Sequence, residues 1–136
     1  MSVGGPSTLF DVARRGMSAQ LVRMNAAASN LANAGTVASS EAQVYRPIRA
    51  VFAEDLDRAS GLASVKVQGV IRESVAPIKS HDPTHPLADA NGDVWTSPVD
   101  ENAEMVEMLE SSRQYQNMVE ALSTAKQLMI ETMRLK

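Results

Sequence analysis

The 136-residue sequence has no cysteine, which excludes disulfide bonds, thiol catalysis and Cys-ligated metals. Aromatic residues are also scarce, with two Phe, two Tyr and one Trp. The large side chains that dominate globular cores are therefore mostly missing. Eight Met and many Ala take their place, and this composition favours long contacts between helices over a compact core.

Long apolar runs are absent too, since no stretch approaches the roughly 18 to 20 residues of a membrane span. The start of the chain, MSVGGPSTLF, lacks the basic and apolar regions of a cleaved secretion signal. If the protein leaves the cytoplasm, we expect a route that reads no such signal. The net charge of −3 provides no basic footprint, so nucleic acid is not an expected partner.

Both ends of the chain carry apolar residues that recur every seven positions. These residues are Phe10, Met17, Met24 and Leu31 in the N-terminal stretch and Met108, Tyr115, Leu122 and Met129 in the C-terminal stretch. Other apolar residues lie three or four positions away, which is the spacing of a narrow apolar stripe on a helix. Because another helix must cover such a stripe, we expect the two ends to pair with each other and with other subunits.

Capping residues predict where the two helices begin and end. The first helix is predicted from about Ser7, as N-cap, to about Asn33, with Gly35 as a left-handed C-cap residue. Gly16 lies inside it, either as a tolerated defect or because a neighbouring backbone approaches closely. The second helix is predicted to follow Asp100, as N-cap, and to run roughly 35 residues without Pro or Gly. Lengths on the order of 40 and 50 Å follow, and a domain of this size cannot cover them alone.

The two predicted helices carry charge of opposite sign. Residues 7–33 contain three Arg and one Asp, whereas residues 101–136 contain six Glu, two Arg and two Lys. Exposed pairs of opposite charge contribute only about 0 to 1 kcal/mol each. The charges are therefore expected to set the alignment of the helices more than their stability.

The middle of the chain changes to the alternating pattern of strands. Residues 48–52, 65–71 and 94–96 are predicted as strands. Asn91-Gly92 predicts a hairpin in which both turn residues have positive φ. Residues 36–43, rich in Ser and Ala, predict a flexible connection.

These elements predict a fold that is mainly α with a small β insert (α+β). The N- and C-terminal helices are expected to form an antiparallel coiled-coil-like pair. Residues 1–35 with 100–136 are predicted to form a discontinuous helical core domain. Residues 36–99 are predicted to form an extended connector and a small β-containing segment.

Two groups of residues have a spacing that resembles a metal site. Asp89, Asn91 and Asp93 resemble the opening of a calcium loop, but Val94 stands where that loop needs Gly. A solvated hairpin turn is therefore the preferred interpretation, with a calcium-binding module as the alternative.

His81 and His85 also have a metal-like spacing, but Pro83 and Pro86 interrupt any helix that would bring them to one face. They are expected to be loop histidines. The sequence contains no Gly-rich phosphate loop and no nucleophile elbow. We therefore predict that the protein is not an enzyme and that it holds no cofactor or metal.

Specific motifs at both ends resemble the rod and hook proteins of the bacterial flagellum. Residues 20–34 read QLVRMNAAASNLANA and resemble the N-terminal helix motif of that family, including its Asn-rich end. Residues 85–136 resemble the C-terminal half of proximal rod proteins. This stretch contains ADANG, Glu104-Met105, SRQYQ at 112–116 and TAK at 124–126 in the order and spacing of that family.

The resemblance implies a structural subunit of the proximal rod, which assembles through its terminal helices into a tubular drive shaft that transmits torque and encloses the export channel. A sister protein of the proximal rod is the close alternative, and a calcium-binding or helix-binding module is the alternative from another class. The implied partners are other copies, other proximal and distal rod subunits, the protein that joins the rod to the MS ring, and the type III export apparatus. The implied location is the periplasm-spanning rod of the basal body.

The stripes and the resemblance together predict an assembly interface. Its residues are Phe10, Met17, Leu21, Met24, Asn30, Leu31, Asn33, Met105, Met108, Tyr115, Leu122, Met129 and Met133.

Overall fold

The computed structural model describes residues 6–57 and 61–135. The described chain begins with helix α1 (Pro6–Ala32) and ends with helix α2 (Glu101–Arg134). The strands between them are β1 (Val37–Ala38), β2 (Ile48–Asp57), β3 (Leu62–Arg72), β4 (Ile78–His81) and β5 (Asp93–Thr96). A mixed and mainly helical α+β fold is therefore confirmed.

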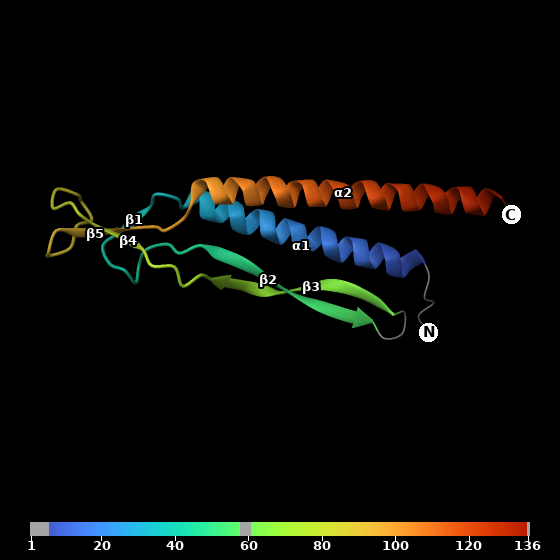
Figure 1. Ribbon diagram of the computed structural model, residues 1–136, viewed down its shortest axis with the longest axis horizontal. Coiled ribbons are helices and arrows are strands. Elements are labelled where there is room, and N and C mark those ends of the chain that lie inside the picture. The colour runs from blue at the N-terminus through green and yellow to red at the C-terminus, as the bar shows by residue number, and fades with distance from the viewer. Residues whose placement is uncertain (1–5, 58–60, 136) are drawn as a thin grey trace.

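The molecule is elongated and consists of three layers (Figure 1). α1 lies in the middle, with α2 antiparallel beside it on one side and the β2–β3 hairpin along its other side. The small sheet, with strand order β1-β5-β4, lies at the end where α1 stops and α2 starts. The start of α1 and the end of α2 therefore lie together at the far end of the molecule.

The helix ends follow from local chemistry. Asp100 caps α2 as predicted, because its carboxylate accepts a hydrogen bond from the Ala103 N–H at 3.2 Å. The prediction of Ser7 as the cap of α1 is wrong, since Ser7 lies within the helix, which the structure describes from Pro6 onward. Gly35 follows α1 with a φ of 74°, as predicted for its left-handed role.

The predicted strands exist but are longer than expected in the β2–β3 hairpin. The antiparallel register runs from the pair Ile48 and Arg72 to the pair Asp57 and Leu62, with an irregularity between Val51 and Phe52. The polar end of β2 was not predicted because acidic residues are rare in strands. Here the acidic side chain has a partner on the neighbouring helix, since Asp55 forms an ion pair of 2.9 Å with Arg15 of α1.

Two predictions about the small sheet are wrong. β4 and β5 are not joined by a two-residue turn at Asn91-Gly92, because their register ends at His81 and Asp93 and residues 82–92 form a longer loop. Within the described residues only glycines have positive φ, so Gly92 adopts it and Asn91 does not. The predicted flexible connection at 36–43 contains β1, which pairs with β5.

The interior of the described chain is unusual in its chemistry. The buried apolar side chains are small, namely Ala19, Ala26, Ala27, Val44 and Val94. The largest fully buried side chains are polar: Glu104, Asn30 and Ser111. The fold is therefore held by small-residue packing and polar contacts, while most large apolar side chains keep some exposed surface. Over the described residues, neither helix combines the length and the apolar character needed to cross a membrane.

Gly16 marks a close approach between the two helices. It is buried, and a Cβ atom at this position would lie 2.9 Å from Sδ of Met118 in α2. The close neighbour is thus a flexible side chain and not a backbone. An interior glycine otherwise costs a helix about 1 kcal/mol relative to alanine.

We predict that Gly16→Ala alone changes the free energy of unfolding by less than about 1 kcal/mol, because the helix gains propensity while Met118 must shift. In a Met118→Ala background the same substitution should stabilise the protein by about 1 kcal/mol. Urea unfolding followed by circular dichroism measures both values. Equal effects of Gly16→Ala in the two backgrounds would contradict the contact.

Candidate functional site

The Asn-rich end of α1 anchors the first residue of β2. The side-chain amide of Asn30 donates to the Ile48 carbonyl at 2.9 Å, and its oxygen accepts the Ile48 N–H at 2.8 Å. The Tyr45 hydroxyl donates to the same oxygen at 2.8 Å. Asn30 therefore pairs with Ile48 as a neighbouring strand would, and this fixes where the β2–β3 hairpin leaves the helix.

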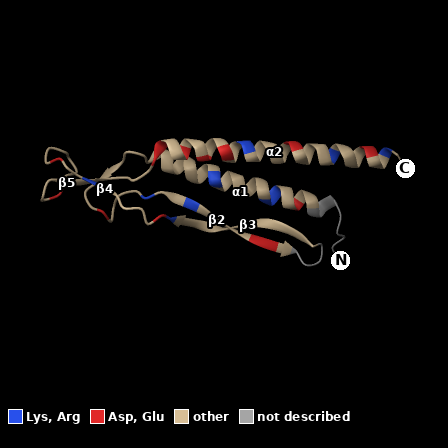
Figure 2. Cartoon of the chain, in the orientation of Figure 1, with Lys and Arg blue, Asp and Glu red and all other residues tan. Residues whose placement is uncertain are grey.

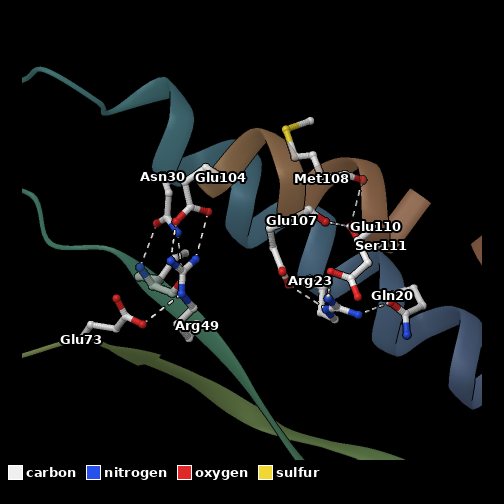
Figure 3. A network of polar contacts seen from close by, with 11 residues as sticks. Gln20, Arg23, Asn30, Arg49, Glu73, Glu104, Glu107, Met108, Glu110 and Ser111 are labelled. Carbon is white, nitrogen blue, oxygen red and sulfur yellow. Dashed lines mark hydrogen bonds and ion pairs between the residues drawn. The ribbon is translucent and has the colours of Figure 1, made fainter. Parts of the chain in front are cut away.

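The next residue of β2 connects the hairpin to α2. Arg49 binds both carboxylate oxygens of Glu104, with Nη1 donating to Oε2 at 2.9 Å, and its Nε donates to Glu73 at 3.0 Å (Figure 3). The Glu104 side chain is 1% exposed and that of Arg49 is 35% exposed. We call Asn30, Arg49, Glu73 and Glu104 the junction clamp, because together they join all three layers.

A second polar contact joins the two helices directly. Arg23 of α1 donates through Nε to Glu107 of α2 at 2.8 Å and lies 4.0 Å from Glu110 (Figure 3). Its Nη1 also donates to Gln20 at 2.9 Å. This contact agrees with the predicted attraction between a basic first helix and an acidic second helix.

Both arginines remain charged at every accessible pH. The hydrogen bond to Glu104 raises the pKa of Arg49 above its already high ordinary value, and Glu73 adds to this effect. The hydrogen bond to Glu107 likewise raises the pKa of Arg23. A buried carboxylate is costly unless it is paired, so the Glu104 contact needs this permanent cation.

The end of α1 is also tied to the segment that precedes α2. Nδ2 of Asn33 donates to the Ser29 carbonyl at 2.8 Å, and the Asn33 carbonyl accepts the Thr36 hydroxyl at 2.7 Å. The Ser97 N–H then donates to the Thr36 carbonyl at 2.9 Å. The Asn-rich motif thus shapes the turn after α1 and holds the start of α2 near it.

We predict that Arg49→Ala destabilises the protein by about 3 kcal/mol, because Glu104 is left as a buried charge without its partner. Adding Glu104→Gln should recover part of this loss, since the buried charge is removed. Urea unfolding of both variants provides the measurement. The junction clamp would be refuted if the two substitutions were additive, that is, if Glu104→Gln lowered the free energy of unfolding by the same amount in the Arg49→Ala variant as in the unmodified protein.

The predicted interface residues fall into three groups by exposure. Those that are half-buried are Phe10, Met17, Met24, Leu31, Asn33, Met108, Tyr115, Leu122 and Met129. Leu21, Met105 and Met133 are exposed, at 43%, 53% and 72%. Asn30 is the buried one and its amide is used within the chain, so its side chain offers no surface to a second subunit.

The less exposed residues of α2 form a regular row. The row consists of Glu104, Met108, Ser111, Tyr115, Met118, Leu122, Ala125 and Met129, with alternating spacings of four and three. Met118 lies against Gly16, so this row faces α1. Ser111 is buried in this row, and its hydroxyl is satisfied by donating to the Glu107 carbonyl at 2.7 Å.

Sequence reasoning identified the apolar stripes but not the junction clamp. One signal was available, since Glu104 occupies a position of the row and breaks its apolar pattern. The signal does not name a partner, because Arg49 is distant in the sequence and lies in a strand. The ion pair could only be found once the three layers were placed together.

A groove of about 790 Å³ lies beside the junction. Its lining comes from Asn33, residues 36–38, residues 42–46 and residues 72–74. The Arg72 guanidinium stacks over the Tyr45 ring at 5.3 Å. These lining residues include neither His nor Cys, and they present no pair of nucleophile and base.

The loop between β4 and β5 uses its own oxygen atoms. One carboxylate oxygen of Asp89 accepts the N–H groups of Asn91 at 2.9 Å and Asp93 at 2.8 Å. The Asp93 carboxylate in turn contacts His81 at 3.0 Å and Lys79 at 3.1 Å. Among the residues that the structure describes, no three acidic, His or Cys side chains gather as metal ligands.

His81 and His85 do not act together. His81 contacts Asp93, whereas Nδ1 of His85 accepts the Leu87 N–H at 3.0 Å. The contact with His81, followed by that with Lys79, lowers the pKa of the Asp93 carboxyl from its ordinary 3.8. The stabilisation from this carboxylate is therefore present above that value and is lost as the pH falls through the lowered pKa.

We predict that His81→Ala moves the pKa of Asp93 upward, toward the ordinary value, because the main cause of its depression is removed. His85→Ala is the matched control and should leave it unchanged. A titration of the side-chain carboxyl carbon by NMR measures both. An identical titration curve in the two variants would show that the His81 contact is absent in solution.

Comparisons with known proteins identify the class. A family model described as "Flagella basal body rod protein" matches residues 10–37, and one described as "Flagellar basal body rod FlgEFG protein C-terminal" matches residues 90–135. These ranges cover most of α1 and all of α2. The fold and these matches define a structural protein of the flagellar basal-body rod.

Individual relatives define the family within this class. The flagellar basal-body rod protein FlgC of Salmonella typhimurium (strain LT2) is 44% identical over 128 residues, which is 93% of this chain and 95% of the relative. FlgC of Yersinia enterocolitica is 39% identical, with the same coverage. FlgC of Agrobacterium fabrum is 30% identical over 95% of this chain and 94% of the relative. The chain therefore belongs to the FlgC family of flagellar basal-body rod proteins.

This membership bears on the alternatives from the sequence. The sister protein of the proximal rod, FlgB, is not favoured, because these relatives are FlgC proteins. The prediction that the chain is not an enzyme is confirmed, since the relatives are named as structural rod proteins.

Proposed function

We propose that the chain assembles through α1 and α2 into a tubular shaft that transmits torque and surrounds the flagellar export channel. Residues 1–35 with 100–136 would form the helical core of the wall, and residues 36–99 would form a connector and a small β-containing segment. The proposal is carried by one observation: the large apolar residues of both stripes keep part of their surface exposed in the single chain.

The helix pair supports packing of the coiled-coil kind. The row on α2 repeats with spacings of four and three, which is the pattern of the buried positions in a coiled coil. The row contains Met108, Tyr115, Leu122 and Met129, and each of them keeps exposed surface. Full burial of a Leu or Met side chain contributes about 1.5 to 3 kcal/mol. The chain already covers most of each side chain, so neighbouring helices would add the remaining fraction of this contribution at each position of the two stripes.

Met suits this role because its flexible side chain fits partners of different shape. A shaft built from several kinds of subunit needs such tolerance where one kind meets another. The expected partners are other copies, other proximal and distal rod proteins, and the protein that joins the rod to the MS ring. The proposed location is the part of the rod that spans the periplasm, reached through the flagellar type III export apparatus.

The three layers suit a protein under twisting load. Two long helices in contact spread a load over many side chains. The junction clamp holds the hairpin and both helices at a fixed angle, because Arg49 contacts Glu104 and Glu73 from a strand that Asn30 anchors. A twist applied to one layer is therefore passed to the others.

We predict that Leu122→Asp abolishes incorporation into basal bodies while export continues, because Leu122 lies in the row that faces α1 and a charge there is costly in the folded subunit and more so once neighbours surround it. Thr124→Asp is the matched control, since this neighbouring side chain is exposed. Immunoblots of isolated basal bodies and of exported protein give the two readouts, and swimming in soft agar gives a third.

Normal swimming of the Leu122→Asp strain would show that the assembly interface does not include Leu122. Loss of incorporation in both variants would show that this part of α2 accepts no charge at all, which would remove the distinction between its two faces. Absence of the unmodified chain from basal bodies would refute the proposed function itself.

A further inference from the structure

Helix α2 has exposed apolar residues at its two ends. Near its start, Met105, Val106 and Leu109 are exposed by 53%, 62% and 71%, and we call them the start patch. Near its end, the exposed residues are Leu128, Ile130, Met133 and Leu135, at 58%, 42%, 72% and 89%, and we call them the end patch. The stretch between the patches is mostly polar on its outer side, where Val119 is the exposed large apolar residue.

The end patch lies beyond the reach of α1 in the described chain. Gly16 lies against Met118, and Arg23 lies near Glu110 at 4.0 Å. Continuing this antiparallel register by ten residues places Pro6, the first described residue, near Leu128. The last turns of α2 therefore project past α1, as Figure 1 shows.

The composition of the projecting segment calls for a partner. Residues 128–135 read LMIETMRL, so five of the eight side chains are apolar and Glu131 and Arg134 occupy one side of the helix. Exposed apolar residues that cluster on a surface mark a site of interaction with another protein. Within residues 6–57 and 61–135, α1 does not extend far enough to cover these side chains.

The charges around the two patches differ in sign. Residues 101–110 contain four Glu and no Lys or Arg, and since Glu104 is paired with Arg49 and Glu107 with Arg23, the exposed acidic residues there are Glu101 and Glu110. Lys126, Glu131 and Arg134 lie at the end patch (Figure 2). Within the described residues, neither Lys126 nor Arg134 forms an ion pair. Opposite charge favours contact between an end patch and a start patch over contact between two start patches.

We propose that the end patch of α2 packs against the start of the equivalent C-terminal helix in the next rod subunit, where apolar residues lie among glutamates as they do in residues 101–110. The partner is a subunit of the rod family, either a copy of this chain or a related protein. The C-terminal family model matches residues 90–135, so related rod proteins share the sequence pattern of the helix that carries both patches.

Such a contact joins different surfaces of two subunits. A contact between unlike surfaces leaves one surface of each kind free at the two ends of a pair of subunits. Further subunits can therefore add, and they form an open helical array when the rotation between subunits does not close a ring. A shaft needs this kind of growth along its axis. The inference therefore rests on the proposed function and adds to it which surfaces meet.

The test places a photoreactive benzoylphenylalanine at Met133 and, in a second variant, at Val106. Gln116, an exposed polar position between the patches, is the control. Basal bodies are isolated and irradiated, and the joined peptides are identified by mass spectrometry. Adducts from Met133 are expected on the first turns of a rod subunit's C-terminal helix, and adducts from Val106 on the last turns of one. The control should give neither product.

The inference is overturned if the variant with the photoreactive residue at position 133 is present in basal bodies but forms no adducts. Adducts from this position on ring proteins or on N-terminal helices would overturn it as well. If the bulky residue at Met133 prevents incorporation, the same reading is made from Leu135, which is the more exposed position. Failure of these adducts with normal incorporation leaves the proposed function intact. Absence of the unmodified chain from basal bodies would instead refute the proposed function.

Discussion

A helix of 34 residues presents more apolar surface than a chain of this size can cover, and the rest of the structure depends on that constraint. α1 covers one row of α2, but its own register ends near Leu128. The chain has few aromatic residues with which to build a larger core. Its two stripes therefore stay partly exposed in the single subunit, and we propose that other subunits cover the exposed part.

The contacts inside the chain and the contacts left for assembly use different chemistry. Within the chain, small residues and the junction clamp fix the layers, because ion pairs and amide hydrogen bonds depend on direction. The surface left for partners is apolar and rich in Met, and its attraction depends little on direction. Arg49 and Glu104 thus set the angle of the stripes before assembly, and the stripes then accept neighbours of different sequence.

The sequence predicted the local features well. Heptad spacing and the Asp100 cap located both helices, because these signals act within one turn. It failed where distant residues decide the outcome. β2 runs on to Asp57, where Arg15 of another layer pairs with Asp55, and residues 82–92 form a loop in which Asp89 accepts the Asp93 N–H. The clamp was missed for the same reason, since Arg49 and Glu104 are 55 residues apart. Motif resemblance indicated the rod family before any of these contacts was known.

An image reconstruction of isolated basal bodies, at a resolution that shows side chains, tests the central claim most directly. The account predicts that α1 and α2 lie in the wall of the rod, with Met17, Met24, Leu122 and Met129 enclosed by helices of neighbouring subunits. It also predicts that the Arg49 and Glu104 contact is kept. A chain that lies outside the rod wall, or whose stripes face solvent in the assembled rod, would contradict it.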